Sequence, residues 1–308
     1  MINRILIRIK VIQIIYSYYL NIKKDLSTVE NELFFSLGKT YELYHLLLLL
    51  PIDITELQKR KQDAAKHKLL PSEKDLTPDT KFVNNKFVAQ LSENNSLRKF
   101  VAGEKISWVN DANLIKKLLD SILSSDIYND YMHSTDNSFE ADREFWRKIF
   151  KTFVCNNDDL EQALEDHSIY WNDDLDIVST FVLKTIKRFD PHSGREQELL
   201  PMFKDQDDMQ FAKELLLQTI LHQSEYNEWI QKQAKNWEFE RIAFMDLIIM
   251  QTALAELTNF PTIPVNVTLN EYIEIAKQYS TEKSGTFING ILDGIIASLR
   301  NENKLLKN

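Results

Sequence analysis

The chain has 308 residues, 44% of them hydrophobic, which is enough to bury a full core in one large domain or two smaller ones. Only 6 Gly, 7 Pro and one cysteine, Cys155, are present, which disfavours a β fold with many turns and excludes an intramolecular disulfide framework. The formal charge of −9 is uneven, because residues 126–210 hold 20 acidic and 9 basic residues.

The first 20 residues are apolar enough to raise the question of an export signal or a membrane anchor. Arg4, Arg8 and Lys10 interrupt the segment, however, and no small-residue cleavage pattern follows Leu20. We therefore expect neither a signal peptide nor a membrane span. Together with the lone Cys155, this predicts a cytoplasmic protein.

The N-terminal segment is predicted to form a basic helix over residues 3–21. Its polar residues recur at helical spacing: Asn3, Lys10, Gln13, Ser17 and Asn21. Residues 1–24 contain no acidic residue and five basic ones: Arg4, Arg8, Lys10, Lys23 and Lys24. This basic arm is separate from the acidic middle of the chain.

The next segments alternate helical periodicity with breaks. A capping-box spacing from Ser27 to Glu30 predicts the start of a second helix, which should stop at Pro51. Periodicity resumes over residues 54–70. Residues 71–107 are rich in Pro, Asn and Ser and are predicted to form a long ordered loop.

The acidic middle is predicted to be mostly helical. Residues 108–133 and 140–188 have helical patterns, and the run at 190–194 contains Pro and Gly and should end the second one. Carboxylate-rich stretches at 157–159 and 172–174 lack the spacing of a calcium loop. We interpret them as helix caps and solvated turns.

The last hundred residues give the clearest pattern. An amphipathic helix is marked by Met209, Ala212, Leu216 and Ile220. Residues 242–257 are apolar on nearly every side, which predicts a central helix packed all round by others. After a Pro-rich turn, a capping-box spacing from Thr268 to Glu271 predicts the next helix, and a final helix should begin near Ser284.

Three glycines lie in the final helix, where each interior glycine costs about 1 kcal/mol relative to alanine. We interpret Gly290 and Gly294 as points of close packing against a neighbouring helix. Gly285 lies near the helix start, where it could let a backbone or a phosphate approach.

No catalytic or metal-binding motif stands above chance. The sequence has no Gly-rich phosphate loop, no His-Glu-x-x-His and no cysteine pair, and its six histidines show no ligand-like spacing. We therefore expect a protein that is not an enzyme and that carries no metal and no cofactor.

The basic residues of the first helix are the clearest candidates for binding. Arg4, Arg8 and Lys10 are spaced so that they could meet successive phosphates of one nucleic-acid strand. The competing interpretation is a solvated charged face. The nearby tyrosines at positions 16, 18 and 19 could stack on unpaired bases or could belong to the core.

Several segments in succession resemble the C-terminal half of the NusB family. They are the stretch that begins Arg241-Ile-Ala-Phe-Met-Asp, the Ile263-Pro264 pair, the run Leu-Asn-Glu-Tyr-Ile-Glu-Ile-Ala-Lys at 269–277, and the run Phe-Ile-Asn-Gly-Ile-Leu-Asp at 287–293. In the first helix, the family's Arg-x-x-x-Arg, Gln and Tyr pattern is matched by Arg4, Arg8, Gln13 and Tyr16. About half of the chain is covered.

The resemblance implies an all-α, NusB-like helical bundle with a large, mostly helical central insertion. Residues 1–50 would form the N-terminal helices of the bundle and residues 206–308 its C-terminal helices. Residues 51–205 would form the acidic insertion.

The resemblance also implies a transcription antitermination factor. It would bind single-stranded boxA RNA jointly with the ribosomal protein NusE, within an RNA polymerase complex that reads through terminators, notably in ribosomal RNA operons. The family's RNA-binding positions correspond to Arg4, Arg8, Lys10, Lys283 and Phe287. Its NusE contacts correspond to Tyr16 and Asp246.

This chain departs from the family pattern at a few positions. Its first helix is less rich in arginine, with Ile5, Leu6 and Ile9 in the basic segment, and Gln251 stands where a basic residue is expected. Lys283 occupies a position that is acidic in some relatives.

Two other functions fit parts of the sequence less well. A helical scaffold that binds only protein would have lost the RNA site, and its affinity need not fall with salt. An RNA cytosine methyltransferase can carry a NusB-like domain, but it needs a nucleotide-binding α/β domain and reactive cysteines, which this chain does not show.

Overall fold

The computed structural model describes residues 1–21, 25–234, 239–302 and 305. Within them the chain is all helical, and the only β pairing among these residues is an isolated bridge between Ile2 and Phe203. The all-α prediction is therefore confirmed. No helix in the described ranges is long and apolar enough to cross a membrane.

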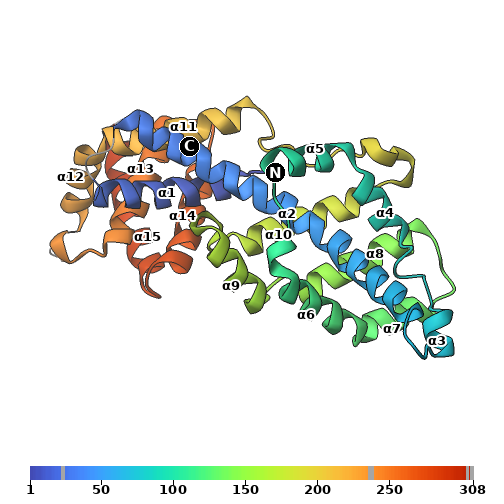
Figure 1. Cartoon of the computed structure of the whole chain (residues 1–308). Helices are drawn as coiled ribbons and strands as arrows, with labels where there is room; N and C mark the ends of the chain where they lie inside the picture. Colours follow the sequence, from blue (N-terminus) through green and yellow to red (C-terminus); the bar gives the residue numbers. More distant parts are fainter. Residues whose placement is uncertain (22–24, 235–238, 303–304, 306–308) are drawn as a thin grey trace. The chain divides into compact units, whose positions relative to one another are not determined.

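The chain folds into two compact units, one made by its two ends and one by its middle (Figure 1). Unit 2 comprises residues 2–37 and 203–308, and unit 1 comprises Met1 and residues 38–202. The helices of unit 2 are α1 (Arg4–Leu20), the start of α2 (Leu26–Lys66), α11 (Gln206–Leu221), α12 (Gln223–Gln233), η4 (Phe239–Arg241), α13 (Phe244–Asn259), α14 (Val265–Tyr279) and α15 (Ser284–Asn301).

Unit 1 holds the rest of α2 and the remaining helices. These are α3 (Glu73–Leu76), α4 (Lys86–Glu93), α5 (Asn95–Glu104), η1 (Val109–Asp111), α6 (Ala112–Leu123), α7 (Asp126–His133), α8 (Phe139–Phe153), α9 (Asp158–His167), η2 (Ile169–Trp171), α10 (Leu175–Arg188) and η3 (Pro191–Glu196). The helical pattern predicted for 108–133 and 140–188 is confirmed, divided into several shorter helices.

Unit 2 is built around α13. Every residue from 248 to 257 is buried, because α1, α11, α12, α14 and α15 all contact this helix. The central helix predicted at 242–257 is confirmed. A helix that is apolar all round is stable only when others cover every side of it.

Unit 1 packs around α8, which contacts α4, α6, α7 and α10. An aromatic cluster fills its core: the Phe82 ring centroid lies 5.9 Å from that of Phe145 and 5.8 Å from that of Trp146. The later part of α2 is tied to this unit by two indole hydrogen bonds. Trp108 Nε1 donates to the Leu46 carbonyl at 2.8 Å, and Trp171 Nε1 donates to the Lys39 carbonyl at 2.7 Å.

The helix predicted to stop at Pro51 instead continues through it to Lys66. A proline inside a helix costs about 3 kcal/mol, because it removes a hydrogen bond and crowds the preceding turn. Leu50 and Ile54, on either side of Pro51, are 0% and 1% exposed. Each buried aliphatic side chain contributes roughly 1.5–3 kcal/mol, so packing offsets the cost of the proline.

The long loop predicted at 71–107 is also wrong, because residues 73–76, 86–93 and 95–104 are helical. Each helix begins at a side-chain cap. The Asn85 side chain accepts from Val88 N at 3.0 Å, and that of Asn94 accepts from Leu97 N at 2.9 Å. The asparagines that suggested a loop therefore start helices.

Both predicted capping boxes are displaced. Helix α2 is capped by Asp25, whose carboxylate accepts from Thr28 N at 2.8 Å, and not by Ser27. Helix α14 begins at Val265, so Thr268 lies inside it and is buried.

The glycine interpretation is confirmed at one position. A side chain at Gly294 would overlap that of Gln233 from α12, whereas Gly290 has nothing close to it. The break predicted at 190–194 is confirmed by the short η3 helix, in which Gly194 has a φ of 51°.

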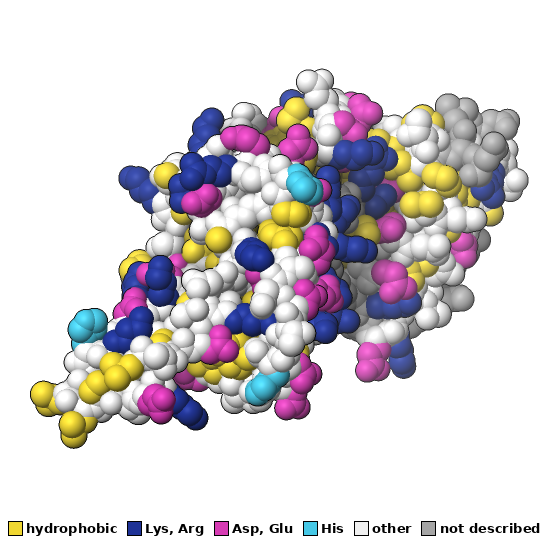
Figure 2. Space-filling view, turned by 90° about the vertical axis from the view of Figure 1, so that its right-hand side faces the viewer, with side chains coloured by type: hydrophobic (Ala, Val, Ile, Leu, Met, Phe, Trp, Pro, Cys, Tyr) yellow, Lys and Arg dark blue, Asp and Glu magenta, His cyan; other side chains and the backbone are white. Residues whose placement is uncertain are grey.

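Figure 2 shows acidic and basic side chains together on one face of the molecule.

Candidate nucleic-acid interface

Arg8, a predicted phosphate contact, lies in the interior of unit 2. Its guanidinium forms a bidentate ion pair with Glu256 of α13, in which Nε donates to Oε2 at 2.7 Å and Nη2 donates to Oε1 at 2.8 Å. The two side chains are 3% and 0% exposed. Glu256 also accepts hydrogen bonds from the hydroxyls of Thr268 at 2.8 Å and Tyr272 at 3.2 Å.

This network joins α1 to α13 and α14. Burial alone would lower the pKa of Arg8, but its hydrogen bonds to Glu256 and the nearby acidic groups raise it overall. Burial also raises the pKa of Tyr272 well above its usual value. The Arg8 guanidinium is therefore charged, buried and paired with Glu256, so the structure gives it a structural position in place of the predicted phosphate contact.

Lys10 has a similar placement. It is 1% exposed and lies in a stretch of α1, residues 6–12, in which every residue is buried, so its ammonium group is not presented to a ligand at the surface. Lys23 and Lys24 of the basic arm lie outside the described residues.

Arg4 remains accessible at the start of α1. Its side chain is 40% exposed, it pairs with Asp208 of α11 at 3.2 Å, and its guanidinium lies 5.0 Å from the centre of the Phe211 ring. An exposed ion pair of this kind is weak, so a phosphate can compete for the arginine.

Lys283 and Phe287 lie together at the start of α15, in the wall of a groove of about 550 Å³. Lys283 is exposed and Phe287 is partly exposed. The exposed Arg241 from η4 also lines the groove. The sequence prediction did not include Arg241 among the RNA-binding residues. The sequence feature that could have indicated Arg241 is its position directly before the central apolar helix. Glu282 is an exposed acidic group in the same wall.

Asp246 is 5% exposed and holds the start of α15 in place. Its carboxylate accepts hydrogen bonds from Ser280 Oγ at 2.5 Å and from Ser284 Oγ at 3.0 Å. A carboxylate at a helix N-terminus also interacts favourably with the helix dipole. The predicted partner contact is therefore better described as the support of the groove wall.

Tyr16 lies on the surface near the same end of α13. It is 37% exposed, and its ring centroid lies 5.3 Å from that of Phe244, which is 38% exposed. The Tyr19 ring lies 6.3 Å from Phe244, and the Tyr19 hydroxyl donates to Gln251 Oε1 at 3.0 Å. Sequence reasoning missed Phe244, which completes this aromatic surface.

The structure thus separates the seven predicted residues. Arg4 and Tyr16 are 12 residues apart on one helix, a distance of about 18 Å at 1.5 Å per residue. Four of the predicted residues lie near the starts of α13 and α15: Tyr16, Asp246, Lys283 and Phe287. No group of three or more potential metal ligands occurs in the described parts of the chain.

Comparisons with known proteins identify the family. The model of the NusB family matches residues 190–297. The transcription antitermination protein NusB of Salinibacter ruber is 37% identical over 132 residues, which cover 41% of this chain and 82% of that protein. The NusB of Geotalea daltonii is also 37% identical, over 45% of this chain and 92% of its own length. This chain belongs to the NusB family.

A solved structure of T. maritima NusB is 30% identical and covers 44% of this chain and 83% of its own. Its TM-score is 0.29, so the assignment to the family rests on the sequence relatives.

Proposed function

We propose that this chain is an RNA-binding transcription antitermination factor of the cytoplasm, and not an enzyme. It binds boxA-type single-stranded RNA together with the ribosomal protein NusE, within an RNA polymerase complex, and promotes read-through, notably of ribosomal RNA operons. Its relatives in the NusB family are named transcription antitermination proteins, which supports the class.

The observation that carries the proposal is the groove at the start of α15. Arg241 and Lys283 supply two cations to neutralise phosphates, and Phe287 supplies a ring face on which an unpaired base can stack. Arg4 would contact the strand farther along. Arg8 and Lys10, which the resemblance included, are omitted because they are buried.

The partner surface in this proposal is the aromatic pair Tyr16 and Phe244. Aromatic side chains with one exposed face are enriched in protein interfaces because they bury a large area at low entropic cost. Asp246 acts indirectly, by fixing the helix that carries Lys283 and Phe287.

The middle of the chain, residues 51–205, is proposed to be an acidic helical elaboration of a shorter bundle. The Salinibacter relative is matched over 82% of its own length by 41% of this chain. The additional segment would provide a further protein contact or cover a surface that shorter relatives use to dimerise.

The test is fluorescence anisotropy of a labelled boxA-type RNA at two salt concentrations, with and without NusE. Wild type is compared with Lys283→Ala and Phe287→Ala. Arg300→Ala is the matched control, because Arg300 is exposed at the other end of the same helix. At a rise of 1.5 Å per residue, Arg300 lies about 25 Å along the helix from Lys283.

We expect binding that weakens with salt and tightens with NusE. Phe287→Ala should weaken it by about tenfold, since a stacked base contributes about 1–3 kcal/mol. Lys283→Ala should lower the salt dependence by about 0.7 in log–log slope. Binding that is insensitive to salt and to both substitutions, in folded protein, would favour the protein-binding scaffold.

A further inference from the structure

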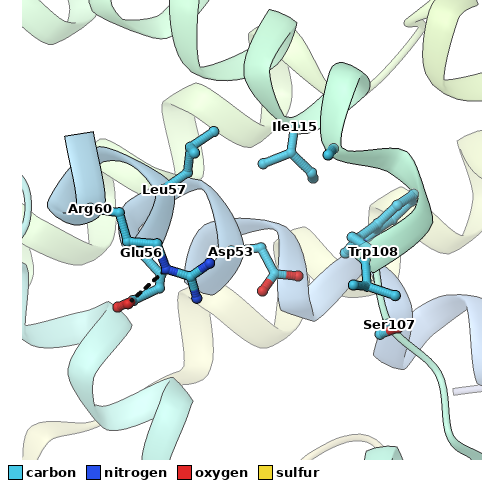
Figure 3. A pocket seen from close by; sticks show the side chains of 9 residues that line it. Asp53, Glu56, Leu57, Arg60, Ser107, Trp108 and Ile115 are labelled. Carbon is cyan, nitrogen blue, oxygen red and sulfur yellow. Dashed lines mark hydrogen bonds and ion pairs between the residues drawn. The ribbon is translucent and has the colours of Figure 1, made fainter. Parts of the chain in front are cut away.

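A groove of about 350 Å³ runs along the later part of α2 in unit 1, opposite residues 107–115, a segment that contains η1 and the start of α6 (Figure 3). It lies outside the residues that match the NusB family model. Leu57 of α2 and Trp108 and Ile115 of the opposite segment give the groove an apolar lining.

Trp108 anchors one wall of this groove. The Trp108 side chain is 2% exposed, and its indole Nε1 donates to the Leu46 carbonyl at 2.8 Å. At the rim, by contrast, Val109 is 77% exposed, so apolar surface is presented to solvent at the edge of a preformed groove. Such surface is available to a partner without any rearrangement of the walls.

The carboxylate of Asp53 points into this groove, between Arg60 and Trp108 (Figure 3). Its oxygens accept no hydrogen bond from any described residue, and the carboxylate forms no ion pair with a described residue. Burial raises its pKa to about 6, although the charge of Arg60 acts in the opposite direction. A partly buried carboxylate without a partner is unfavourable for folding, and such groups gather at binding sites.

Arg60 does not serve as that partner. Its Nε bonds to Glu56 Oε1 at 3.3 Å, and its side chain is 74% exposed. Among the lining side chains, Asp53 and Glu56 are acidic and Arg60 is basic. The carboxylate of Asp53 therefore places a negative charge in the groove, and Arg60, which offsets that charge in part, is exposed and paired with Glu56.

We propose that this groove binds a lysine or arginine side chain from a protein partner. The cationic group would meet Asp53, while its aliphatic stem would lie along Leu57 and Trp108. Long basic side chains fit because their methylene groups cover apolar surface while the charged end reaches a carboxylate. Apolar residues that flank the basic one would cover Val109 and the rim.

The probe is an acetylated and amidated pentapeptide with one lysine between two leucines. Two comparison peptides carry norleucine or glutamate in place of the lysine. The full-length protein is labelled with 5-fluorotryptophan, and the Trp108 signal, assigned with Trp108→Phe, is followed by 19F NMR during titration. Because Trp108 lines the groove, its signal reports occupancy directly.

We expect the lysine peptide to shift the Trp108 signal saturably and to bind about tenfold more tightly than the norleucine peptide, as a charge-assisted hydrogen bond would give. Asp53→Asn, which keeps the size of the side chain, should remove this preference. Asp63→Asn, which changes an exposed carboxylate of the same helix, should retain it. Arg60→Ala should tighten binding about twofold by removing a competing cation.

Three results would overturn the proposal. They are equal affinity for the lysine and norleucine peptides, preference for the glutamate peptide, or no shift of the wild-type signal at millimolar peptide. A fourth result, weaker binding of the lysine peptide to Arg60→Ala than to wild type, would also count against the proposal, because the proposal treats Arg60 as a competing cation.

Discussion

At the scale of single residues, the surroundings of a charged group decide its role more than its type does. Arg4 and Arg8 lie one turn apart on α1 and look equivalent in the sequence. Arg4 is 40% exposed beside one carboxylate, whereas Arg8 is 3% exposed and bound by two hydrogen bonds to a fully buried Glu256. Only the first is available to a ligand at the surface.

This difference gives a stability prediction. Arg8→Ala should lower the free energy of unfolding by about 3–5 kcal/mol, because it leaves Glu256 charged and without its main partner in the interior. Arg4→Ala, the matched substitution at a partly exposed pair, should cost less than about 1 kcal/mol. Urea denaturation followed by circular dichroism measures both, and similar losses would contradict this account.

The same comparison corrects the expected RNA site. Of the five predicted RNA-binding residues, Lys283 and Phe287 share one groove and Arg4 lies at the far end of α1. The phosphate-binding role of these three residues stays a prediction. Arg241 joins the candidate RNA groove because it lines that groove, and Phe244 joins the candidate partner surface because its ring lies beside that of Tyr16.

At the scale of elements, side-chain caps decide where several helices of unit 1 begin. The Asn94 side chain is fully buried and has two roles: it accepts from Leu97 N at 2.9 Å and donates to the Gln197 carbonyl at 2.7 Å. It thus starts α5 and ties that helix to the segment after η3.

Asn94→Ala is therefore expected to destabilise the protein by about 2 kcal/mol, since a lost cap costs about 1 kcal/mol and an unsatisfied buried carbonyl costs about as much again. Asn95→Ala is the control, because Asn95 is exposed and lies next in the chain. Thermal unfolding of the two variants measures the difference, and an Asn94→Ala protein as stable as the control would refute the double role.

At the scale of the whole molecule, the two ends of the chain form one unit and the middle forms the other. The two passages between units lie close together within unit 2: the Phe34 and Phe203 ring centroids are 6.4 Å apart. The middle segment therefore leaves and re-enters unit 2 at neighbouring points, as an inserted segment would.

We expect a variant in which residues 38–202 are replaced by a short Gly-Ser linker to remain helical and to unfold cooperatively. Its affinity for boxA-type RNA should stay within about threefold of wild type, a difference of under about 1 kcal/mol. Circular dichroism and the anisotropy assay measure these properties. A folded variant with lost affinity would show that the middle segment takes part in RNA binding.

The sequence by itself determined the features that depend on local pattern. Helical periodicity predicted the all-α class, the position of α1 and the central helix at 242–257, because a repeat of apolar residues is contained within one element. The succession of short segments near the C-terminus was likewise enough to indicate the NusB family.

Only the tertiary structure decided features that depend on distant residues. Helix α2 continues through Pro51 because buried neighbours offset the cost of the proline, and neither the pattern nor the propensity of that segment contains this information. Arg8 leaves the candidate RNA site because Glu256, 248 positions away in the chain, meets it in the interior. A sequence shows which groups carry charge, but burial and pairing fix what the charge does, and both depend on residues that folding brings together.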